Sequence, residues 1–191
     1  NVLLDFCWKD HIARFGFQGE KADRIAQAMM LGPIWPKLDL GLESDEDILE
    51  QFVAHTPELE QEIRLVFSDL STIVREYEGS VDWIESLKAR GYHTYYLSNY
   101  GERIRREASK ELSFLSHMDG GIMSYTVHLA KPDPAIYQTL LDRYGLKAEE
   151  CVFLDDTKAN IDGALRAGMQ GILVKTQEQA MQDLDELLKT N

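Results

Sequence analysis

The first part of the chain carries apolar residues at helical spacing. Trp8, Ile12 and Phe15 are separated by four and three positions, the spacing that places side chains on one face of an α-helix. No stretch of alternating apolar and polar residues, the pattern of a half-buried strand, occurs in this region. We therefore expect residues 8–78 to form an all-α segment of about four helices.

Proline, glycine and serine mark where these helices begin and end. Pro33 and Pro36 interrupt the helical pattern and predict a loop over Gly32–Gly41. Ser44 is expected to be the N-cap of the next helix, because its hydroxyl can accept a hydrogen bond from a backbone N–H of the first turn. Pro57 predicts the start of the fourth helix.

After Gly79 the pattern changes to short apolar runs that alternate with helices. Ser80 is expected to cap a helix that ends at Gly91. Strands are expected at His93–Leu97, Gly121–Ser124, Cys151–Leu154 and Gly171–Val174. This alternation predicts a parallel, doubly wound sheet with right-handed crossovers, in which ligands bind beyond the carboxyl ends of the strands.

Composition excludes several classes of partner. The formal net charge of −13 indicates an acidic surface that repels phosphate backbones, so we expect no nucleic-acid partner. No apolar run approaches the ~20 residues that span a bilayer, so no membrane partner is expected. Cys7 and Cys151 lie far apart in the sequence and in different contexts. We therefore expect no disulfide framework and a location in the reducing cytoplasm.

Two adjacent carboxylates directly follow one of the predicted strands. Val152, Phe153 and Leu154 form an apolar run, and Asp155 and Asp156 come next. Paired acids at the carboxyl end of a buried strand indicate a site for a hard cation. The same pair is also typical of a polar loop or of a helix N-cap.

Two other polar motifs precede the acid pair. Ser98 and Asn99 follow the strand expected at His93–Leu97, and Lys131 is followed by two prolines in Lys-Pro-Asp-Pro. Because Ser98 and the acid pair both follow strands, they are expected at the same ligand-binding edge of the sheet. The alternatives are an ordinary helix N-cap for Ser98 and a solvated loop lysine for Lys131.

In this order the three motifs resemble those of the haloacid dehalogenase-like (HAD) hydrolase superfamily. The resemblance implies that Ser98 and Asn99 bind the substrate phosphate and that Lys131 neutralises its charge, with Ser98 and Lys131 taking part in catalysis. It implies Mg²⁺ as the cofactor. Asp156 would be the direct ligand, and Asp155 would act through a bound water or by orienting its neighbour.

The resemblance also implies a fold and a domain organisation. The fold class is α/β, with a doubly wound parallel-sheet core of the HAD-like Rossmannoid type made of residues 1–7 and 79–191. An all-α helical cap, residues 8–78, is inserted near the N-terminus. Asn160 is expected to steady the loop that carries the acid pair.

The family's nucleophile, an Asp at the end of the first strand, has two alternative positions. The opening string Asn1-Val2-Leu3-Leu4-Asp5-Phe6 resembles the segment that follows the nucleophile in the Asp-x-Gly-Asn-Val branch, which places the catalytic Asp and the first strand before residue 1. In the other reading Asp5 is the nucleophile, although Phe6 and Cys7 do not continue the family pattern.

The function that these residues imply is a Mg²⁺-dependent phosphatase. It would hydrolyse a small phosphorylated metabolite, similar to a sugar phosphate, through an aspartyl-phosphate intermediate. The alternatives are a haloacid dehalogenase-type hydrolase and, if the chain truly begins at Asn1, a non-catalytic metabolite-binding domain. The paired acids favour the phosphatase, because displacing halide from carbon does not need a metal. Neither the exact substrate nor the oligomeric state follows from the sequence.

Overall fold

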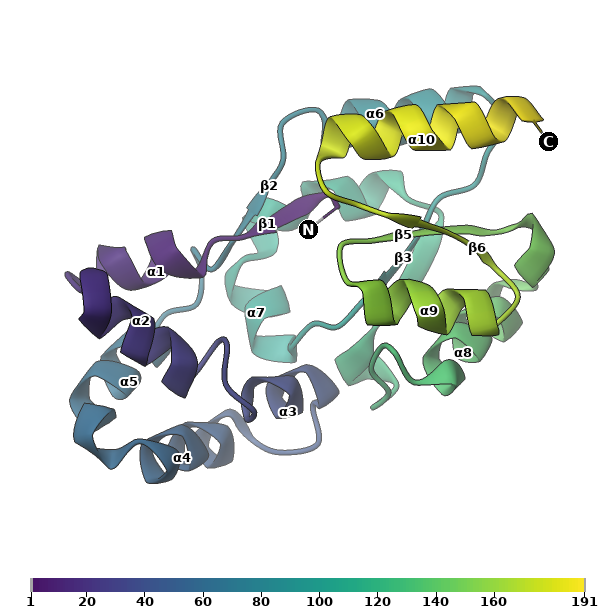
Figure 1. Ribbon diagram of the computed structural model, residues 1–191. Helices are drawn as coiled ribbons and strands as arrows, with labels where there is room; N and C mark the ends of the chain where they lie inside the picture. Colours follow the sequence, from purple (N-terminus) through teal and green to yellow (C-terminus); the bar gives the residue numbers. More distant parts are fainter. Residues whose placement is uncertain (1, 191) are drawn as a thin grey trace. The chain divides into compact units, whose positions relative to one another are not determined.

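A computed structural model describes residues 2–190, which fall into two compact units. Unit 1 comprises Asn1–Asp5 and Leu129–Asn191, and unit 2 comprises Phe6–His128. Figure 1 labels most of the helices and strands of both units. Asn1, the first residue of the string that resembles the segment after a nucleophile, lies outside the described residues.

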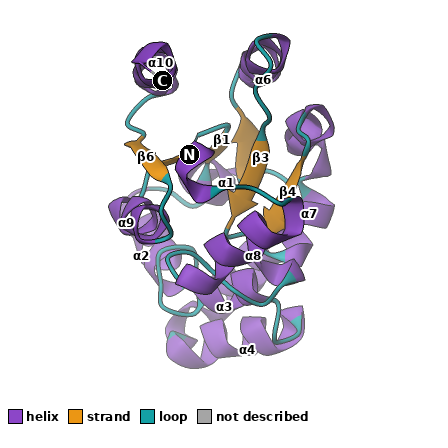
Figure 2. Cartoon of the chain, turned by 90° about the vertical axis from the view of Figure 1, so that its right-hand side faces the viewer, coloured by secondary structure: helices purple, strands orange, loops and turns teal. Residues whose placement is uncertain are grey.

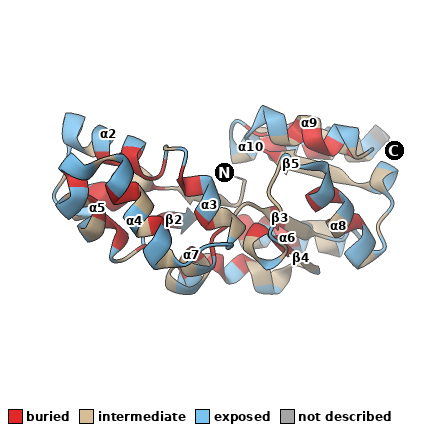
Figure 3. Ribbon diagram, turned by 90° about the horizontal axis from the view of Figure 1, so that it is seen from below, coloured by how far each residue is buried: buried red, intermediate tan, exposed pale blue. Residues whose placement is uncertain are grey.

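Unit 2 begins with a group of short helices that pack on one another. α1 (Trp8–Arg14) packs against α2 (Gly19–Ala28), and α4 (Asp45–His55) packs against α5 (Glu60–Phe67), which also contacts α2. Their apolar faces form a buried core (Figure 3). Its fully buried side chains include Ile12, Ile25, Met29, Ile48, Phe52, Ile63 and Phe67. The helical pattern read from the sequence is confirmed for these elements.

The predicted helix boundaries are partly confirmed. Ser44 is the N-cap of α4, and its hydroxyl accepts a hydrogen bond from the N–H of Asp47 at 3.1 Å. Pro57 begins a short 3₁₀ turn, η1 (Pro57–Leu59), that leads directly into α5. The expectation that Ser80 caps α6 (Ser80–Ala89) is wrong. Gly79, with a positive φ of 83°, is the N-cap, and the serine lies inside the helix.

The loop predicted over Gly32–Gly41 is wrong in its second half, which forms helix α3 (Trp35–Leu40). Pro36 lies in the first turn, where its missing N–H would have no partner within the helix. Gly41 ends the helix with a φ of 63°, a left-handed conformation that glycine adopts without strain. The buried Trp35, at the first position of the helix, anchors it, and neither proline falls where it would break the helix.

A strand occurs where none was expected before residue 79. β2 (Val74–Glu76) is three residues long, and β1 (Leu4–Phe6), at the boundary of the two units, pairs with it in a two-stranded sheet. The N–H of Cys7 donates to the carbonyl of Ile73 at 2.9 Å directly beside this pair. Three residues are too few for an alternating pattern to stand out, which is why the sequence did not reveal this strand.

Each unit contains a pair of parallel strands, and Figure 2 labels both strands of the pair in unit 2. In unit 2, β3 (Tyr95–Ser98) lies beside β4 (Gly120–Met123), and helix α7 (Glu102–Glu107) with the 3₁₀ segment η2 (Ser109–His117) connects them. A further 3₁₀ turn, η3 (Ser124–Thr126), follows β4. These parallel pairings confirm the α/β class and the alternation of strands with helices.

In unit 1, β5 (Val152–Asp155) lies beside β6 (Gln170–Leu173), and α9 (Lys158–Arg166) connects them and packs on both. Helix α8 (Pro134–Tyr144) packs against α9, and α10 (Gln177–Thr190) contacts β6. The short turn η4 (Ala148–Glu150) leads into β5. The four strands predicted after residue 79 are therefore present, shifted by one or two residues.

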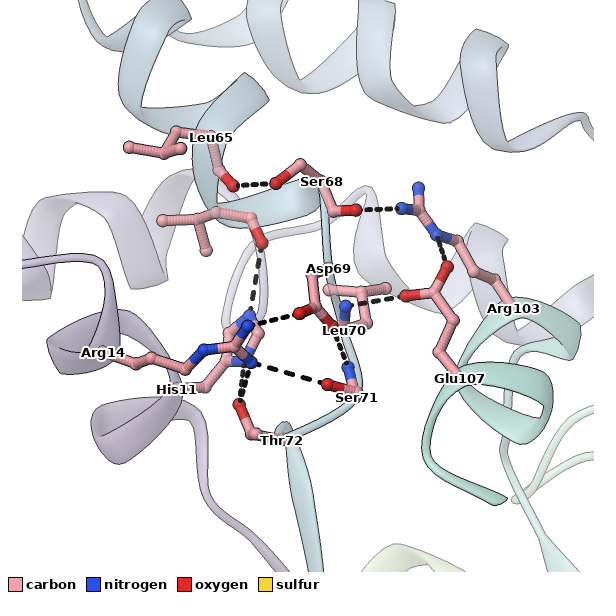
Figure 4. Close-up of polar contacts among 11 residues, drawn as sticks. His11, Arg14, Leu65, Ser68, Asp69, Leu70, Ser71, Thr72, Arg103 and Glu107 are labelled. Carbon is pink, nitrogen blue, oxygen red and sulfur yellow. Dashed lines mark hydrogen bonds and ion pairs between the residues drawn. The ribbon is translucent and has the colours of Figure 1, made fainter. Parts of the chain in front are cut away.

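The two compact units do not follow the boundary predicted at residue 78. Hydrogen bonds within unit 2 cross it, as Figure 4 shows for the carboxylate of Glu107, which accepts from the N–H of Leu70 at 2.7 Å. Glu111 accepts in the same way from the N–H of Glu76 at 3.0 Å. The division into a cap of residues 8–78 and a core of residues 1–7 and 79–191 therefore stays a prediction.

A buried histidine joins α1 to the segment that follows α5 (Figure 4). The ring of His11 is inaccessible to solvent, with Nε2 3.2 Å from the carbonyl of Val66 and Nδ1 3.0 Å from Oγ1 of Thr72. A carbonyl only accepts, so we assign the proton to Nε2, and Nδ1 accepts from the threonine hydroxyl. Arg14 donates to the same hydroxyl and pairs with Asp69. These hydrogen bonds give both ring nitrogens of a neutral His11 side chain a partner.

We expect the free energy of unfolding to fall as the pH drops below about 6.5, because burial lowers the pKa of His11 from its ordinary value. The unfolded chain then binds a proton that the folded chain resists, so stability is lost from about pH 6.5 down to the folded pKa and no further below it. Urea unfolding from about pH 8 to about pH 5.5 measures this loss.

The control is the exposed His93, whose side chain is 76% accessible. The slope of stability against pH should flatten in His11→Gln and change less in His93→Gln. Equal slopes in wild type and His11→Gln would assign the pH dependence to other groups.

No helix within residues 2–190 combines the length and the apolar composition needed to cross a lipid bilayer.

Candidate active site

The acid pair lies at the end of a strand, as the sequence predicted. Asp155 is the last residue of β5, and Asp156 is the next residue along the chain. Asp155 is only 4% exposed, whereas Asp156 is exposed. Neither is the N-cap of α9, because that position belongs to Thr157. The interpretation of the pair as an ordinary N-cap is therefore wrong.

Three hydrogen-bond donors surround the carboxylate of Asp155. Nζ of Lys131 lies 2.6 Å from Oδ2, and Oδ1 accepts from the N–H of Thr157 at 2.8 Å and from Nδ2 of Asn160 at 2.9 Å. A buried carboxylate is stable only when it is paired and hydrogen-bonded in this way. The predicted role of Asn160 in steadying this loop is consistent with its bond to the carboxylate.

Lys131 is a buried cation and not a solvated loop lysine. Its side chain is 9% exposed, and Nζ lies 5.3 Å from the ring centroid of Phe153 in β5. The segment that follows it is fixed: the carboxylate of Asp133 caps α8 by accepting from the N–H of Ala135 at 2.9 Å, and Pro134 is the first residue of that helix. The lysine is thus held against the acid at the end of β5.

The chemistry of these donors fits Mg²⁺. Asp155 and Asp156 offer the hard carboxylate oxygens that this ion prefers. Both oxygens of Asp155 already accept hydrogen bonds, while the side chain of Asp156 is exposed. Within residues 2–190 no cluster of three or more His, Cys, Asp or Glu side chains could hold a metal. Mg²⁺ usually keeps several water ligands and also binds substrate phosphate. Two protein carboxylates are therefore a suitable number for this ion.

Ser98 occupies the last position of β3, with Asn99 directly after it. Helix α7 has Gly101 as its N-cap, so the interpretation of Ser98 as a cap of this helix is wrong. The hydroxyl of Ser98 lies 3.5 Å from the carbonyl of Asn99, at the outer limit of a hydrogen bond. The hydroxyl of Ser98 therefore makes no strong hydrogen bond to the backbone of its own loop.

A buried serine that the sequence analysis missed fixes the loop after β3. Ser124 is inaccessible to solvent, and its hydroxyl accepts from the N–H of Tyr100 at 2.9 Å and donates to the carbonyl of Asp39. The parallel register pairs Ser98 with Met123, so Ser124 follows the neighbouring strand at the same edge. Ser124 was the last residue of the strand predicted at Gly121–Ser124, and a polar residue at a strand end was the available signal.

The structure brings some of the predicted site residues together. Lys131 and Asp155 contact each other in unit 1, with Asp156 adjacent in the chain, whereas Ser98 and Asn99 belong to unit 2. The catalytic, phosphate-binding and metal-binding roles of these five residues stay predictions.

Comparison with known families gives a match over most of the chain. The family model described as haloacid dehalogenase-like hydrolase matches residues 15–168. This range contains Ser98, Lys131 and the acid pair, the residues on which the resemblance was based.

Individual relatives are similar to parts of this chain. A bifunctional epoxide hydrolase 2 from Mus musculus is 34% identical over 109 residues, which cover 55% of this chain and 20% of that protein. A phosphatase from Mycobacterium tuberculosis is 27% identical over 64% of this chain and 59% of its own length. An (S)-2-haloacid dehalogenase from Burkholderia cepacia is 28% identical over 53% of this chain and 44% of its length. The chain thus spans about one-fifth of the mammalian relative.

A solved structure supports the fold. A HAD family enzyme from Bacteroides thetaiotaomicron, in complex with magnesium and inorganic phosphate, aligns with a TM-score of 0.68 and 20% sequence identity. The alignment covers 91% of this chain and 89% of that one. At this level of identity the likeness establishes the HAD-like α/β fold and nothing about the substrate.

Proposed function

Because the chain belongs to the haloacid dehalogenase-like hydrolase family, we propose that it is a Mg²⁺-dependent phosphatase of a small phosphorylated metabolite, similar to a sugar phosphate. The observation that carries this proposal is the buried pair of Lys131 and Asp155 beside the exposed Asp156 at the end of β5. A cation held next to two carboxylates is suited to a dianionic phosphate and a divalent ion.

The proposed reaction passes through an aspartyl-phosphate. A carboxylate oxygen attacks phosphorus, the P–O ester bond breaks, and the leaving alcohol takes up a proton; water then cleaves the acyl phosphate and releases inorganic phosphate. The attacking carboxylate would belong to the family's nucleophilic Asp, and Asp5 is a candidate for it within the described residues.

The roles of the other residues follow from their chemistry. Asp156 would hold Mg²⁺ directly, and Asp155 would act through a bound water or by orienting its neighbour. When bound, Mg²⁺ would supply positive charge that screens the phosphate from the attacking carboxylate. Lys131 spreads the remaining negative charge. Ser98 and Asn99 would donate a hydroxyl and a backbone N–H to phosphate oxygens.

Supporting evidence for the phosphatase also comes from a relative that is named a phosphatase. The dehalogenase stays the second candidate, because another relative is an (S)-2-haloacid dehalogenase. The paired acids favour the phosphatase, since halide displacement from carbon needs no metal. The cytoplasm is the location we propose, on the basis of the free thiols of Cys7 and Cys151.

A direct assay of the natural protein separates these two functions. Inorganic phosphate release is measured over a panel of sugar phosphates and nucleoside monophosphates, with Mg²⁺ and with a chelator, and halide release is measured from 2-chloropropionate. We expect phosphate release that requires Mg²⁺ and is abolished by the chelator. Halide release that is unaffected by the chelator, without phosphate release, would establish the dehalogenase instead.

A further inference from the structure

A tyrosine on a neighbouring helix is connected to Asp155 by hydrogen bonds. Tyr137 of α8 is fully buried, and its hydroxyl donates to the carbonyl of Asn160 at 2.7 Å. The side-chain amide of the same asparagine donates to Oδ1 of Asp155 at 2.9 Å. Tyr137 is thus linked to the carboxylate of Asp155 through one residue, Asn160. This path runs from α8 to the end of β5.

The ring of Tyr137 also packs beside the cation of the site. It meets the ring of Phe153 edge to face, with centroids 5.6 Å apart and an interplanar angle of 86°. Phe153 in turn lies 5.3 Å from Nζ of Lys131. Tyr137 therefore contacts neighbours of both members of the Lys131–Asp155 pair, the asparagine on the acid side and the phenylalanine on the lysine side.

A glycine in α9 makes room for this tyrosine. A Cβ atom at Gly163 would lie 2.7 Å from the hydroxyl oxygen of Tyr137 and 2.8 Å from its ring. Glycine is otherwise the least favourable residue after proline in the interior of a helix. Its presence in the middle of α9 (Lys158–Arg166) is explained by the close approach of the tyrosine, so helix and ring are fitted to each other.

The hydroxyl of Tyr137 stays a donor over the physiological range. Burial, and secondly the negative charge of Asp155, raise the pKa of Tyr137 to about 12. A protonated hydroxyl is what the carbonyl of Asn160 requires, because a carbonyl only accepts hydrogen bonds.

We propose that Tyr137 is a positioning residue of the active site, which holds Asn160 so that its amide orients Asp155 toward Lys131. This inference rests on the proposed function and extends it to a residue that touches neither substrate nor metal. A buried hydrogen-bond chain of this kind fixes the direction of a carboxylate more narrowly than the ion pair alone, because a lysine ammonium has no preferred donor direction.

The test compares Tyr137→Phe with wild type by two measurements that do not depend on activity. The first is the position of the Asn160 side-chain amide signals in the NMR spectrum of ¹⁵N-labelled natural protein, which we expect to shift. The second is Mg²⁺ affinity by calorimetry, which we expect to weaken by about 3–10-fold, less than the roughly 10–100-fold typical when a direct partner of a metal ligand is lost. Gly163→Ala, which must displace the ring, should give both changes.

The control is Tyr92→Phe, which removes an exposed hydroxyl from unit 2 and should leave both measurements unchanged. Unchanged Asn160 signals in Tyr137→Phe, with or without lower stability, would reduce Tyr137 to a packing residue and overturn the proposal. If wild type binds no Mg²⁺ and releases no phosphate, the proposed function fails, while the Asn160 signals still decide the positioning role.

Discussion

Asp156→Asn is expected to weaken Mg²⁺ binding by more than about 100-fold and to abolish phosphate release. Asp156 is the exposed acid of the pair, whereas Asp155 is buried and hydrogen-bonded, so we propose Asp156 as the direct ligand of the ion. Loss of an outer partner costs about 10–100-fold, and loss of the charged ligand itself should cost more. Calorimetric titration with Mg²⁺ and a phosphate-release assay measure the two effects.

Asp162→Asn provides the matched control for this substitution. It makes the same chemical change in the same unit, but Asp162 pairs with Lys158 on α9, where both side chains are partly exposed. This control should bind Mg²⁺ as wild type does. If Asp156→Asn retains wild-type affinity, the assignment of the direct ligand is wrong.

Lys131→Met is expected to lower the free energy of unfolding by about 3–5 kcal/mol, because it leaves the charge of Asp155 buried without its cation. It should also lower kcat by about 10²–10³-fold, the effect typical when one group that stabilises transition-state charge is removed. Urea unfolding gives the first value and the phosphate-release assay gives the second. The methionine keeps most of the volume of the lysine stem, so the lost charge dominates.

Two comparisons separate the buried ion pair from a general effect of losing a lysine. Lys158→Met removes an exposed lysine that pairs with Asp162, and it should change stability by less than about 1 kcal/mol. Adding Asp155→Asn to Lys131→Met should restore much of the lost stability, because the uncompensated charge disappears. Equal losses in Lys131→Met and Lys158→Met would show that the ion pair contributes little.

The sequence by itself determined the features that depend on neighbouring residues. The apolar runs before Ser98 and Asp155 predicted strands β3 and β5 and placed both polar residues at strand ends, since a run of a few apolar residues followed by a polar one has a local signature. The N-cap at Ser44 was also predictable, because it depends only on residues that are neighbours in the sequence. The order of the three motifs was sufficient to indicate the family.

Only the tertiary structure decided which of these residues meet, and in what environment. Lys131 and Asp155 are 24 positions apart, and a loop lysine and a buried cation have the same sequence signature until packing removes the water around them. Tyr137 reads as one more apolar residue of α8 until its hydroxyl is seen to reach Asn160. Likewise His11 meets Thr72 across 61 positions, and α3 forms because Trp35 is buried and Pro36 falls in the first turn, where proline is tolerated. Spacing along the chain encodes periodicity and caps, whereas burial and partner choice depend on elements that approach each other only in the folded chain.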